Sequence, residues 1–397
     1  MLRQAGDVTD LQNRPDTAGG LMISRTTSSV SGAVQVSPFL APSRGGLYRR
    51  RRTSRPGEVN LKSTGLLDPR AAALHRRTLQ ALDPVDVLTY PVLGGVYTTL
   101  AARMGVAPES LVLTAGSDPG LGLLVRAFPT ATRIVTHHPT YQGWDKFAHL
   151  GNCRIDGVPP DPGTGRFVLA DLGTRLEQGP PAFVVVTQPH SLTGQFHEAD
   201  ELAALADTVT GRGSLLVVDT AYLAFTDGGE ELVRDIMGRP GVVRVNSFSK
   251  CYGLSGARIG VIATDPETAC HLFDIDAEGS VSATALALLD ASLRRHDVFE
   301  EIWADVRRLR GDLARRVEEC RPGWRARPSG ANFVTFDVPG AAEAAAATAF
   351  LYDQGYVVRD LSGLPSLPAA VRIAVADHQV VDRVVELLGG WRHEPAG

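Results

Sequence analysis

The chain has 397 residues, of which 44% are hydrophobic and 21% are charged, and its formal net charge is -4 at pH 7. This length and composition predict a globular protein with one large domain and a smaller one. A slightly acidic chain lacks the basic surface that neutralises nucleic-acid phosphates, so we expect no nucleic-acid partner.

Apolar segments and cysteines predict the compartment. No run of about 18 apolar residues occurs, and the N-terminus lacks a signal-peptide pattern, so we expect no membrane partner. The four cysteines are widely spaced and form no CxxC pair. Such usage is typical of a reducing compartment and predicts a cytoplasmic protein.

Residues 1–57 are rich in Ser, Thr, Gly, Pro and Arg and show no sustained periodicity. This composition predicts a flexible N-terminal extension. The arginine run 49–52 is compatible with contact to nucleic acid or lipid head groups, but one short charge run is more typical of a solvated tail.

From about residue 85, short apolar β-branched runs alternate with amphipathic helical stretches. The alternation predicts an α/β large domain over residues 85–285, with a mostly parallel central sheet flanked by helices. In such sheets ligands bind at the carboxyl ends of the strands. The predicted strands are SLVLTAG (110–116), RIVTHHP (133–139), AFVVVTQP (182–189), SLLVVDTAY (214–222), VVRVNSFS (242–249) and ARIGVIAT (257–264).

The rest of the chain predicts a smaller α+β domain, formed by residues 58–84 together with 286–397. A charged helical stretch from about residue 290 leads to the run NFVTFDV and an alanine-rich helix. The runs YVVRDL and VRIAVA and a last helix, VVDRVVELLGGW, follow. Mixed helical and strand periodicities of this kind are typical of an α+β domain.

Two groups of small, hydroxyl or cationic residues at predicted strand ends suit a phosphate. The first group begins a helical pattern, where N–H groups point at a ligand, although an ordinary helix cap looks the same. The second includes an arginine, which binds phosphate bidentately. The residues are Gly116, Ser117 and Asp118 in the first group and Ser247, Ser249 and Arg258 in the second.

Two other strand ends carry Tyr141 and Asp219. Tyr141 lies in a PTY segment, where its ring could stack on a flat ligand or belong to an ordinary loop. Asp219 ends an apolar strand, with Tyr222 three residues later. A buried carboxylate is costly unless a cation meets it, so Asp219 is a candidate functional residue.

Lys250 is one of only three lysines, with Lys62 and Lys146, and it follows an apolar run. A lysine amine in a partly desolvated site can lose its proton and form an imine, which arginine cannot do. The alternative is a surface loop that contains Lys250 and Arg258.

Together, a phosphate cradle, an aromatic ring, a carboxylate and an amine describe pyridoxal 5'-phosphate better than other common ligands. A nucleotide site would need GxGxxG or GxxxxGK[ST], which the sequence lacks. A metal site would need a cluster of ligands, and the pair His137 and His138 does not supply one. We therefore expect this cofactor and no metal.

The segments SFSK and GLSGARIG, in register with VVDTAY, resemble fold-type I pyridoxal-phosphate enzymes of the class I and II aminotransferase family, in the style of the histidinol-phosphate aminotransferases. The similarity runs from about Thr89 to the C-terminus. It implies that Lys250 forms the Schiff base, that Asp219 pairs with the pyridine nitrogen and that Tyr222 contacts the phenolic oxygen. The other implied cofactor contacts are Gly116, Ser117, Asp118, Tyr141, Ser191, Ser247, Ser249 and Arg258.

The resemblance also implies a homodimer with shared active sites, because Tyr90 matches a tyrosine that reaches the phosphate in the neighbouring subunit. For the substrate, it implies that Asn332 lies near it and that Arg372 clamps its α-carboxylate. Arg359 matches a second arginine that binds the far end of the substrate.

Two departures from the family pattern favour a substrate other than histidinol phosphate. The family's NPNNPTG loop is QPHSLTG here, at 188–194, so Ser191 stands where an asparagine donates to the phenolic oxygen. Either Ser191 or His190 must then hold that oxygen. The polar turn NENPYG expected before the first helix is LKSTG here, at 61–65.

These features predict an aminotransferase that acts on an amino acid or amine-bearing metabolite in specialised metabolism, with an internal aldimine at Lys250. A lyase, a decarboxylase or an oxidative deaminase would use the same residues, because the substrate's pose decides which bond breaks. A third class, a ligand-sensing regulator, would need a DNA-binding segment, and no helix-turn-helix pattern precedes the domain.

Overall fold

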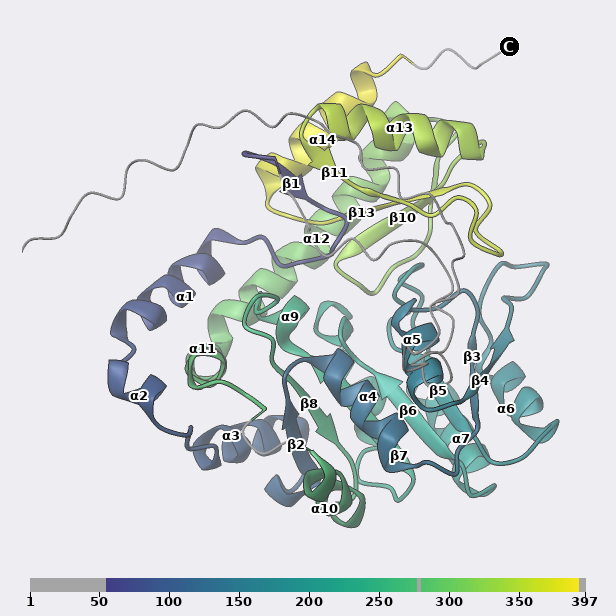
Figure 1. Cartoon of the computed structure of the whole chain (residues 1–397). Helices are drawn as coiled ribbons and strands as arrows, with labels where there is room; N and C mark the ends of the chain where they lie inside the picture. The colour runs from purple at the N-terminus through teal and green to yellow at the C-terminus, as the bar shows by residue number, and fades with distance from the viewer. Residues whose placement is uncertain (1–54, 277–279, 393–397) are drawn as a thin grey trace, which may run out of the picture. The chain divides into compact units, whose positions relative to one another are not determined.

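A seven-stranded sheet lies at the centre of the computed structural model, which describes residues 55–276 and 280–392 (Figure 1). β3 to β7 run parallel, whereas β8 is antiparallel to both β7 and β2. The predicted α/β class and mostly parallel sheet are confirmed. In spatial order the strands are β2 (Leu111–Thr114), β8 (Gly260–Ala263), β7 (Val242–Ser247), β6 (Leu215–Asp219), β5 (Phe183–Thr187), β3 (Arg133–His137) and β4 (Arg154–Val158).

Helices cover both faces of this sheet because its strands are apolar on both sides. In β5, for example, Val185 packs toward one layer and Val184 toward the other. One layer holds α4 (Ser117–Ala127), α5 (Gly143–Leu150) and α10 (Pro266–Ile275), and the other α6 (Leu169–Glu177), α7 (Ala199–Thr210) and α8 (Gly229–Arg234).

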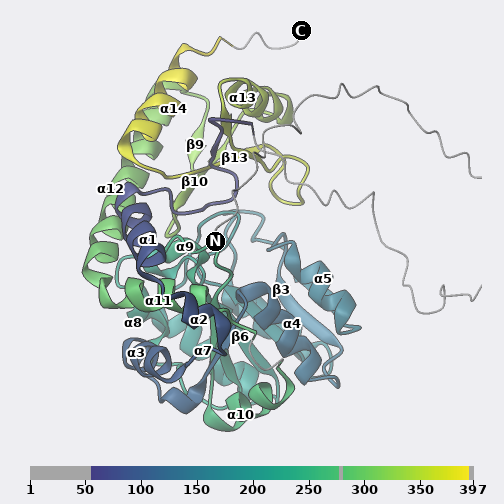
Figure 2. The same ribbon diagram turned by 60° about the vertical axis from the view of Figure 1, so that its left-hand side comes forward.

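A second, antiparallel sheet lies toward the C-terminal part of the chain, in the order β12 (Arg359–Asp360), β13 (Ala370–Ala374), β10 (Phe333–Asp337) and β9 (Arg325–Ala326). The long helix α12 (His296–Cys320) packs beside α14 (His378–Gly390), as Figure 2 shows. The remaining elements are β1 (Val59–Asn60), which pairs with β11 (Tyr356–Val357), and α1 (Pro69–Ala81), α2 (Pro84–Leu88), α3 (Gly94–Met104), α9 (Phe248–Cys251), α11 (Ala283–Arg294) and α13 (Ala341–Asp353).

The domain boundaries expected from the sequence stay predictions. Residues from Arg55 onward form one compact unit that contains both sheets. Almost all of the expected N-terminal extension, residues 1–54, lies outside the described residues. In the described ranges no helix is long and apolar enough to cross a membrane.

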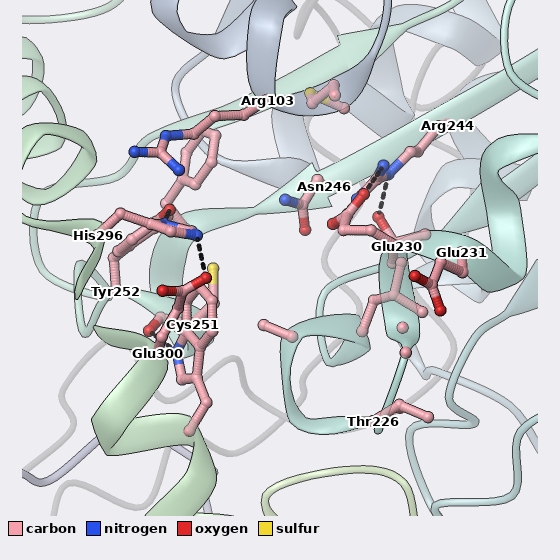
Figure 3. A pocket seen from close by; sticks show the side chains of 18 of the residues that line it. Arg103, Thr226, Glu230, Glu231, Arg244, Asn246, Cys251, Tyr252, His296 and Glu300 are labelled. Atoms are coloured by element: carbon pink, nitrogen blue, oxygen red, sulfur yellow. Dashed lines mark hydrogen bonds and ion pairs between the residues drawn. The ribbon is translucent and has the colours of Figure 1, made fainter. Parts of the chain in front are cut away.

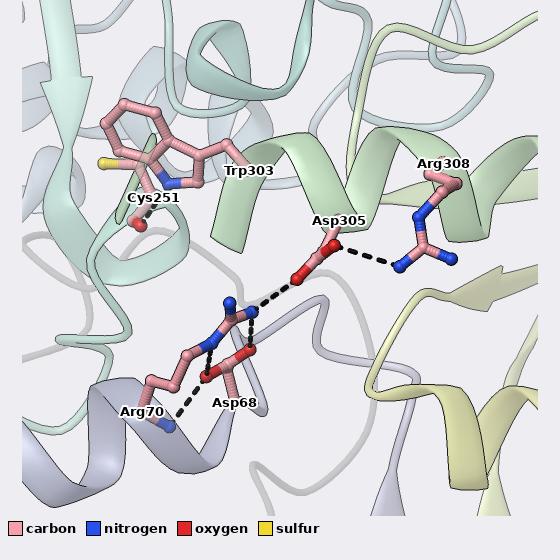
Figure 4. Close-up of polar contacts among 6 residues, drawn as sticks. All are labelled: Asp68, Arg70, Cys251, Trp303, Asp305 and Arg308. Carbon is pink, nitrogen blue, oxygen red and sulfur yellow. Dashed lines mark hydrogen bonds and ion pairs between the residues drawn. The ribbon is translucent and has the colours of Figure 1, made fainter. Parts of the chain in front are cut away.

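The start of α1 is anchored to α12, and this fixes the chain that precedes it (Figure 4). Asp68 caps α1 by accepting a hydrogen bond from the backbone N–H of Arg70 at 2.8 Å. The Arg70 guanidinium also donates to Asp68 at 2.9 Å and to Asp305 of α12 at 2.8 Å. Segment 61–65 is therefore held between β1 and this anchor.

The same helix α12 holds the end of α9, the short helix that carries Lys250. The indole Nε1 of Trp303 donates to the backbone oxygen of Cys251 at 2.7 Å (Figure 4). This bond satisfies a carbonyl that a short helix leaves without an intrahelical donor.

Gly260 in β8 allows the start of α4 to lie directly against the sheet. A Cβ atom at this position would lie 2.8 Å from the carbonyl carbon of Gly116 and from the nitrogen of Ser117, and 2.9 Å from the backbone oxygen of Asn246. All three atoms belong to the backbone, so none can rotate away. A larger residue at position 260 would move the N-terminus of α4 away from β8.

We therefore predict that Gly260→Ala lowers the free energy of unfolding by about 1–3 kcal/mol, the usual penalty of overpacking. Gly256→Ala is the matched control, because a Cβ there meets nothing within 4 Å. Denaturant melts of the cofactor-free protein measure both. Equal stabilities of the two variants would contradict the close approach at Gly260.

Candidate active site

Several of the predicted site residues lie where the strands of the large sheet end. Asp219 is the last residue of β6, Ser247 is the last of β7, and Lys250 follows on α9. The positive charge of Lys250 lowers the pKa of Asp219, so the amine and the carboxylate lie in the same part of the site.

Gly116, Ser117 and Arg258 build a cradle at the N-terminus of α4. Gly116 has φ of 105°, a left-handed region that favours glycine, and directly precedes the helix at Ser117. The Arg258 guanidinium lies so close that a Cβ on Gly116 would be 2.7 Å from its Nη2. Free N–H groups, a hydroxyl and an exposed guanidinium together suit a phosphate.

Ser247 and Ser249, which flank the turn into α9, are both buried. The Ser247 hydroxyl accepts the backbone N–H of Ser249 at 3.3 Å and so caps α9. The cap fixes the direction in which the short helix leaves β7 and hence the position of Lys250.

Tyr141 and Asp118 form a hydrogen-bonded pair beside this cradle. The Tyr141 hydroxyl donates to the Asp118 carboxylate at 2.9 Å. Burial is the main cause that raises the pKa of Tyr141, and the charges of Asp118 and Asp219 add to it. The phenol therefore stays protonated, and its ring has a fixed orientation in which it can face a flat ligand.

Asp219 is a buried carboxylate without a cationic hydrogen-bond partner among the described residues. It accepts one hydrogen bond, from the backbone N–H of Ala221 at 3.1 Å. Burial raises the pKa of Asp219 to about 6, the Ala221 bond and the charge of Lys250 lower it, and Asp118 raises it further. A cationic ring nitrogen at this position would supply the missing partner.

Beyond the end of β6, the buried guanidinium of Arg244 forms an ion pair with Glu230, whose side chain is 54% exposed (Figure 3). The Thr220 hydroxyl accepts from Arg244 Nε at 2.9 Å, and the Arg244 guanidinium donates to both oxygens of Glu230 at 2.7 and 2.8 Å. Arg244 and Glu230 line a cavity of about 520 Å³ that none of the predicted site residues lines. We interpret this network as support for the strand end.

Segment 61–65 contacts Lys250 and Tyr222. The sequence does not predict this contact. The Lys250 amine donates to the backbone oxygen of Ser63 at 2.6 Å. The Tyr222 hydroxyl lies 3.0 Å from Thr64 Oγ1, and Thr64, at φ of 53°, is buried. The only sign of a special role in the sequence is that LKSTG replaces the family's polar turn. That difference does not indicate which residues segment 61–65 contacts.

Arg372 and Arg359 are direct cross-strand neighbours on β13 and β12, so their side chains leave the same face. Arg372 donates to the backbone oxygens of Ser191 and of Lys62, the latter at 2.8 Å. Burial lowers the pKa of Arg372 to about 10. Arg359 donates to the Gln142 side chain at 3.2 Å. Within the described ranges neither guanidinium has a carboxylate partner, so both can bind an anionic ligand.

Several buried polar atoms at the site lack a hydrogen-bond partner in the described part of the chain. They are Ser191 Oγ, Asn332 Oδ1, Thr187 Oγ1 and Arg372 Nε. An unpaired buried polar group costs about 1–3 kcal/mol. Such atoms therefore fit a site that a polar cofactor and its substrate complete, and the residues present fit pyridoxal phosphate.

His190, the alternative donor to the phenolic oxygen, is engaged elsewhere. Its Nε2 lies 3.1 Å from the backbone oxygen of Pro139, and its Nδ1 lies 3.0 Å from Thr193 Oγ1. Both ring nitrogens are thus used, whereas the neighbouring Ser191 hydroxyl is unpaired. Of the two residues, Ser191 therefore has the side chain that is free to donate.

Tyr90, which the resemblance assigns to the site of the neighbouring subunit, is 88% exposed in this chain. Asn332 does reach segment 61–65, where its amide donates to the backbone oxygen of Thr64 at 3.0 Å. Over the described ranges no group of three or more metal-ligating side chains is found.

Comparison with known proteins identifies the family. The model of aminotransferase class I and II matches residues 70–388. The chain belongs to the class I and II aminotransferases. It is thus an enzyme of the pyridoxal-phosphate-dependent fold type I.

Relatives agree with this aminotransferase assignment. The histidinol-phosphate aminotransferase of Thermococcus kodakarensis is 29% identical over 326 residues, which cover 80% of this chain and 88% of the relative. The structure of histidinol-phosphate aminotransferase from Sinorhizobium meliloti, in complex with pyridoxal-5'-phosphate, superposes with a TM-score of 0.73 at 24% identity, over 84% of this chain and 90% of that one. The structure of L-threonine-O-3-phosphate decarboxylase from Porphyromonas gingivalis superposes with a TM-score of 0.70 at 22% identity, over 83% of this chain and 98% of that one. At these identities the two structures show the shared fold alone.

The raised pKa of Asp219 predicts a pH-dependent stability of the cofactor-free enzyme. The pKa of an unfolded aspartate is about 4. Ionised Asp219 therefore destabilises the fold, and the loss grows as the pH rises from about 4 through about 6. Asp219→Asn should raise the free energy of unfolding by about 3 kcal/mol above pH 7 and leave it unchanged below pH about 4.

Denaturant melts across this pH range test the prediction, with Asp145→Asn on the exposed face of α5 as the matched control. A variant no more stable than wild type at high pH would contradict it.

Proposed function

We propose that the enzyme transfers the amino group of an amino acid or amine-bearing metabolite in specialised metabolism, with Lys250 as the residue that binds the cofactor covalently. One observation carries the proposal. The Lys250 amine lies at the end of β7, within the field of the buried Asp219, and its neighbours are residues that suit a phosphate.

The residues that would hold the cofactor divide by the part that they contact. Asp219 would pair with the pyridine nitrogen and Tyr141 would face the ring. Ser191 and Tyr222 would bind the phenolic oxygen. The phosphate would be bound by Gly116, Ser117, Ser247, Ser249 and Arg258, with Asp118 holding Tyr141.

Pyridoxal phosphate, when bound, supplies an electron sink that stabilises negative charge on the substrate carbon. Lys250 would take the proton from that carbon and return it, as general base and acid. Its amine already has a fixed acceptor in the Ser63 carbonyl, which orients it. Thr64 in turn holds the Tyr222 hydroxyl.

Arg372 and Arg359 are the proposed substrate ligands. The unpaired Nε of Arg372 and its low exposure support a bidentate clamp on a carboxylate. Arg359, opposite it in the strand pair, would meet a second anionic group, and Asn332 would line the site between segment 61–65 and β10.

Lys250→Ala should abolish amine transfer, because no other described residue places an amine at this strand end. Lys146→Ala, which changes an exposed lysine of α5, is the matched control and should keep wild-type turnover. Steady-state assays with a keto acid acceptor measure both. Persistent turnover of the Lys250 variant would refute the assignment.

The same residues would serve a lyase, a decarboxylase or an oxidative deaminase, and the shared fold of the decarboxylase structure does not separate them. Wild-type enzyme should be incubated with amines that include histidinol phosphate. Amine transfer that depends on a keto acid supports the proposal. Release of ammonia or carbon dioxide without an acceptor would assign the alternative.

We also propose a homodimer with shared active sites, in the cytoplasm. The support for a second copy is an apolar segment from α2 to the start of α3, in which Val85, Val87, Leu88, Tyr90 and Val92 are 57% to 91% exposed. Cytoplasmic location is supported by the four cysteines, all of which are free.

A subunit-mixing experiment tests the shared site. Lys250→Ala and Tyr90→Ala chains, each weakly active or inactive alone, should recover about a quarter of wild-type activity when unfolded and refolded together, because half of random two-fold dimers then carry one intact site of two. No recovery, with mixed dimers present by mass spectrometry, would contradict sharing.

A further inference from the structure

His190 is a buried imidazole that joins two loops of the site. It lies in the loop 188–194, next to Ser191, and 2% of its surface is exposed. Its Nε2 is 3.1 Å from the backbone oxygen of Pro139, in the loop that carries Tyr141. Its Nδ1 is 3.0 Å from the hydroxyl of Thr193 in its own loop.

The partners of His190 select one tautomer. A carbonyl oxygen can only accept, so Nε2 must carry the proton and donate to Pro139. Nδ1 is then an acceptor and takes the hydroxyl proton of Thr193. Thr193 Oγ1 accepts in turn from the backbone N–H of Gln195 at 3.3 Å. Each donor and acceptor of this chain has a partner, which requires a neutral ring.

The surroundings keep the ring neutral and oriented. The Phe167 ring lies 4.4 Å from His190, centroid to centroid, and the Gln195 amide binds the Phe167 backbone at 2.6 and 2.9 Å. Burial lowers the pKa of His190 to about 3. The charged and titratable groups that act on it are His137, His197 and Arg327.

The backbone of the same loop is held from the opposite side by the second sheet. The backbone oxygens of Ser191, Leu192 and Gly194 accept from Arg372, from the Thr335 hydroxyl at 2.7 Å and from the Gly330 N–H at 2.8 Å. The Ser191 hydroxyl remains free and buried between these two attachments. Its direction therefore depends on the loop being fixed on both sides.

We propose that His190 is a positioning residue, which ties the loop of Ser191 to the loop of Tyr141 and thereby directs the Ser191 hydroxyl at the phenolic oxygen of the cofactor. This proposal rests on the proposed function, since it needs the cofactor. It assigns His190 no contact with the reacting atoms.

The pH midpoint of the absorption change of bound pyridoxal phosphate tests it. Loss of a donor to the phenolic oxygen destabilises negative charge there, so Ser191→Ala should raise the midpoint by about one pH unit. His190→Phe, which keeps a ring against Phe167 but removes both hydrogen bonds, should raise it similarly. The double variant should shift it no further than Ser191→Ala alone.

Two controls keep the test independent of folding. His149→Phe makes the same chemical change on the exposed side of α5 and should leave the midpoint unchanged. If His190→Phe does not fold, Thr193→Val takes its place, since it removes the hydroxyl partner of His190 at nearly constant shape and should raise the midpoint. Thr193→Ser keeps the hydroxyl and should leave the midpoint at the wild-type value.

Additive shifts in the double variant, or equal midpoints for Thr193→Val and Thr193→Ser, would overturn the positioning role alone. A wild-type chain that takes up no pyridoxal phosphate would overturn the proposed function and this role with it.

Discussion

The buried carboxylate of Asp219 is the constraint on which the rest of the site depends. A strand as apolar as β6 brings its last residue into a dry environment, where ionisation is unfavourable and the pKa rises to about 6. The protein supplies Asp219 with one backbone hydrogen bond and the charge of Lys250. The buried guanidinium of Arg244 binds the neighbouring Thr220 and Glu230 instead. The fold therefore keeps a buried carboxylate at some loss of stability, and the proposed cationic ring would bind there.

Other buried polar groups of the site also lack partners. Arg372 is buried, has no carboxylate partner in the described part of the chain and leaves Nε unpaired, and Ser191 Oγ is unpaired beside it. Backbone oxygens of segment 61–65 meet the amine, the amide and the guanidinium of three separate site residues. Rigid attachment combined with unsatisfied polar atoms is what a preorganised ligand site requires.

Much of the fold could be predicted because its physical signal is local. Six of the seven strands of the large sheet are β-branched apolar runs, and Asp219 and Lys250 stand out as charged residues at their ends. The sequence does not predict β4, because RIDGV carries an arginine, an aspartate and a glycine in a strand at the sheet edge, where it is only partly buried.

Contacts between distant segments could not be predicted. The bond between Lys250 and Ser63 joins residues 187 positions apart, and its acceptor is a backbone oxygen that no side chain identifies. The sequence leaves His190 as an alternative donor to the cofactor, because its binding to Pro139 and Thr193 depends on how two loops pack. Tertiary packing, which the sequence pattern alone does not predict, determines the partners of both Lys250 and His190.

Lys250 is the proposed site of covalent attachment of the cofactor, and the small number of lysines makes this attachment directly measurable. Enzyme loaded with pyridoxal phosphate should be reduced with borohydride and digested, and the modified peptide identified by mass spectrometry. We expect a pyridoxyl group on Lys250 in every labelled peptide. Labelling of Lys62 or Lys146 in its place, or no label on a chain shown to be folded, would contradict it.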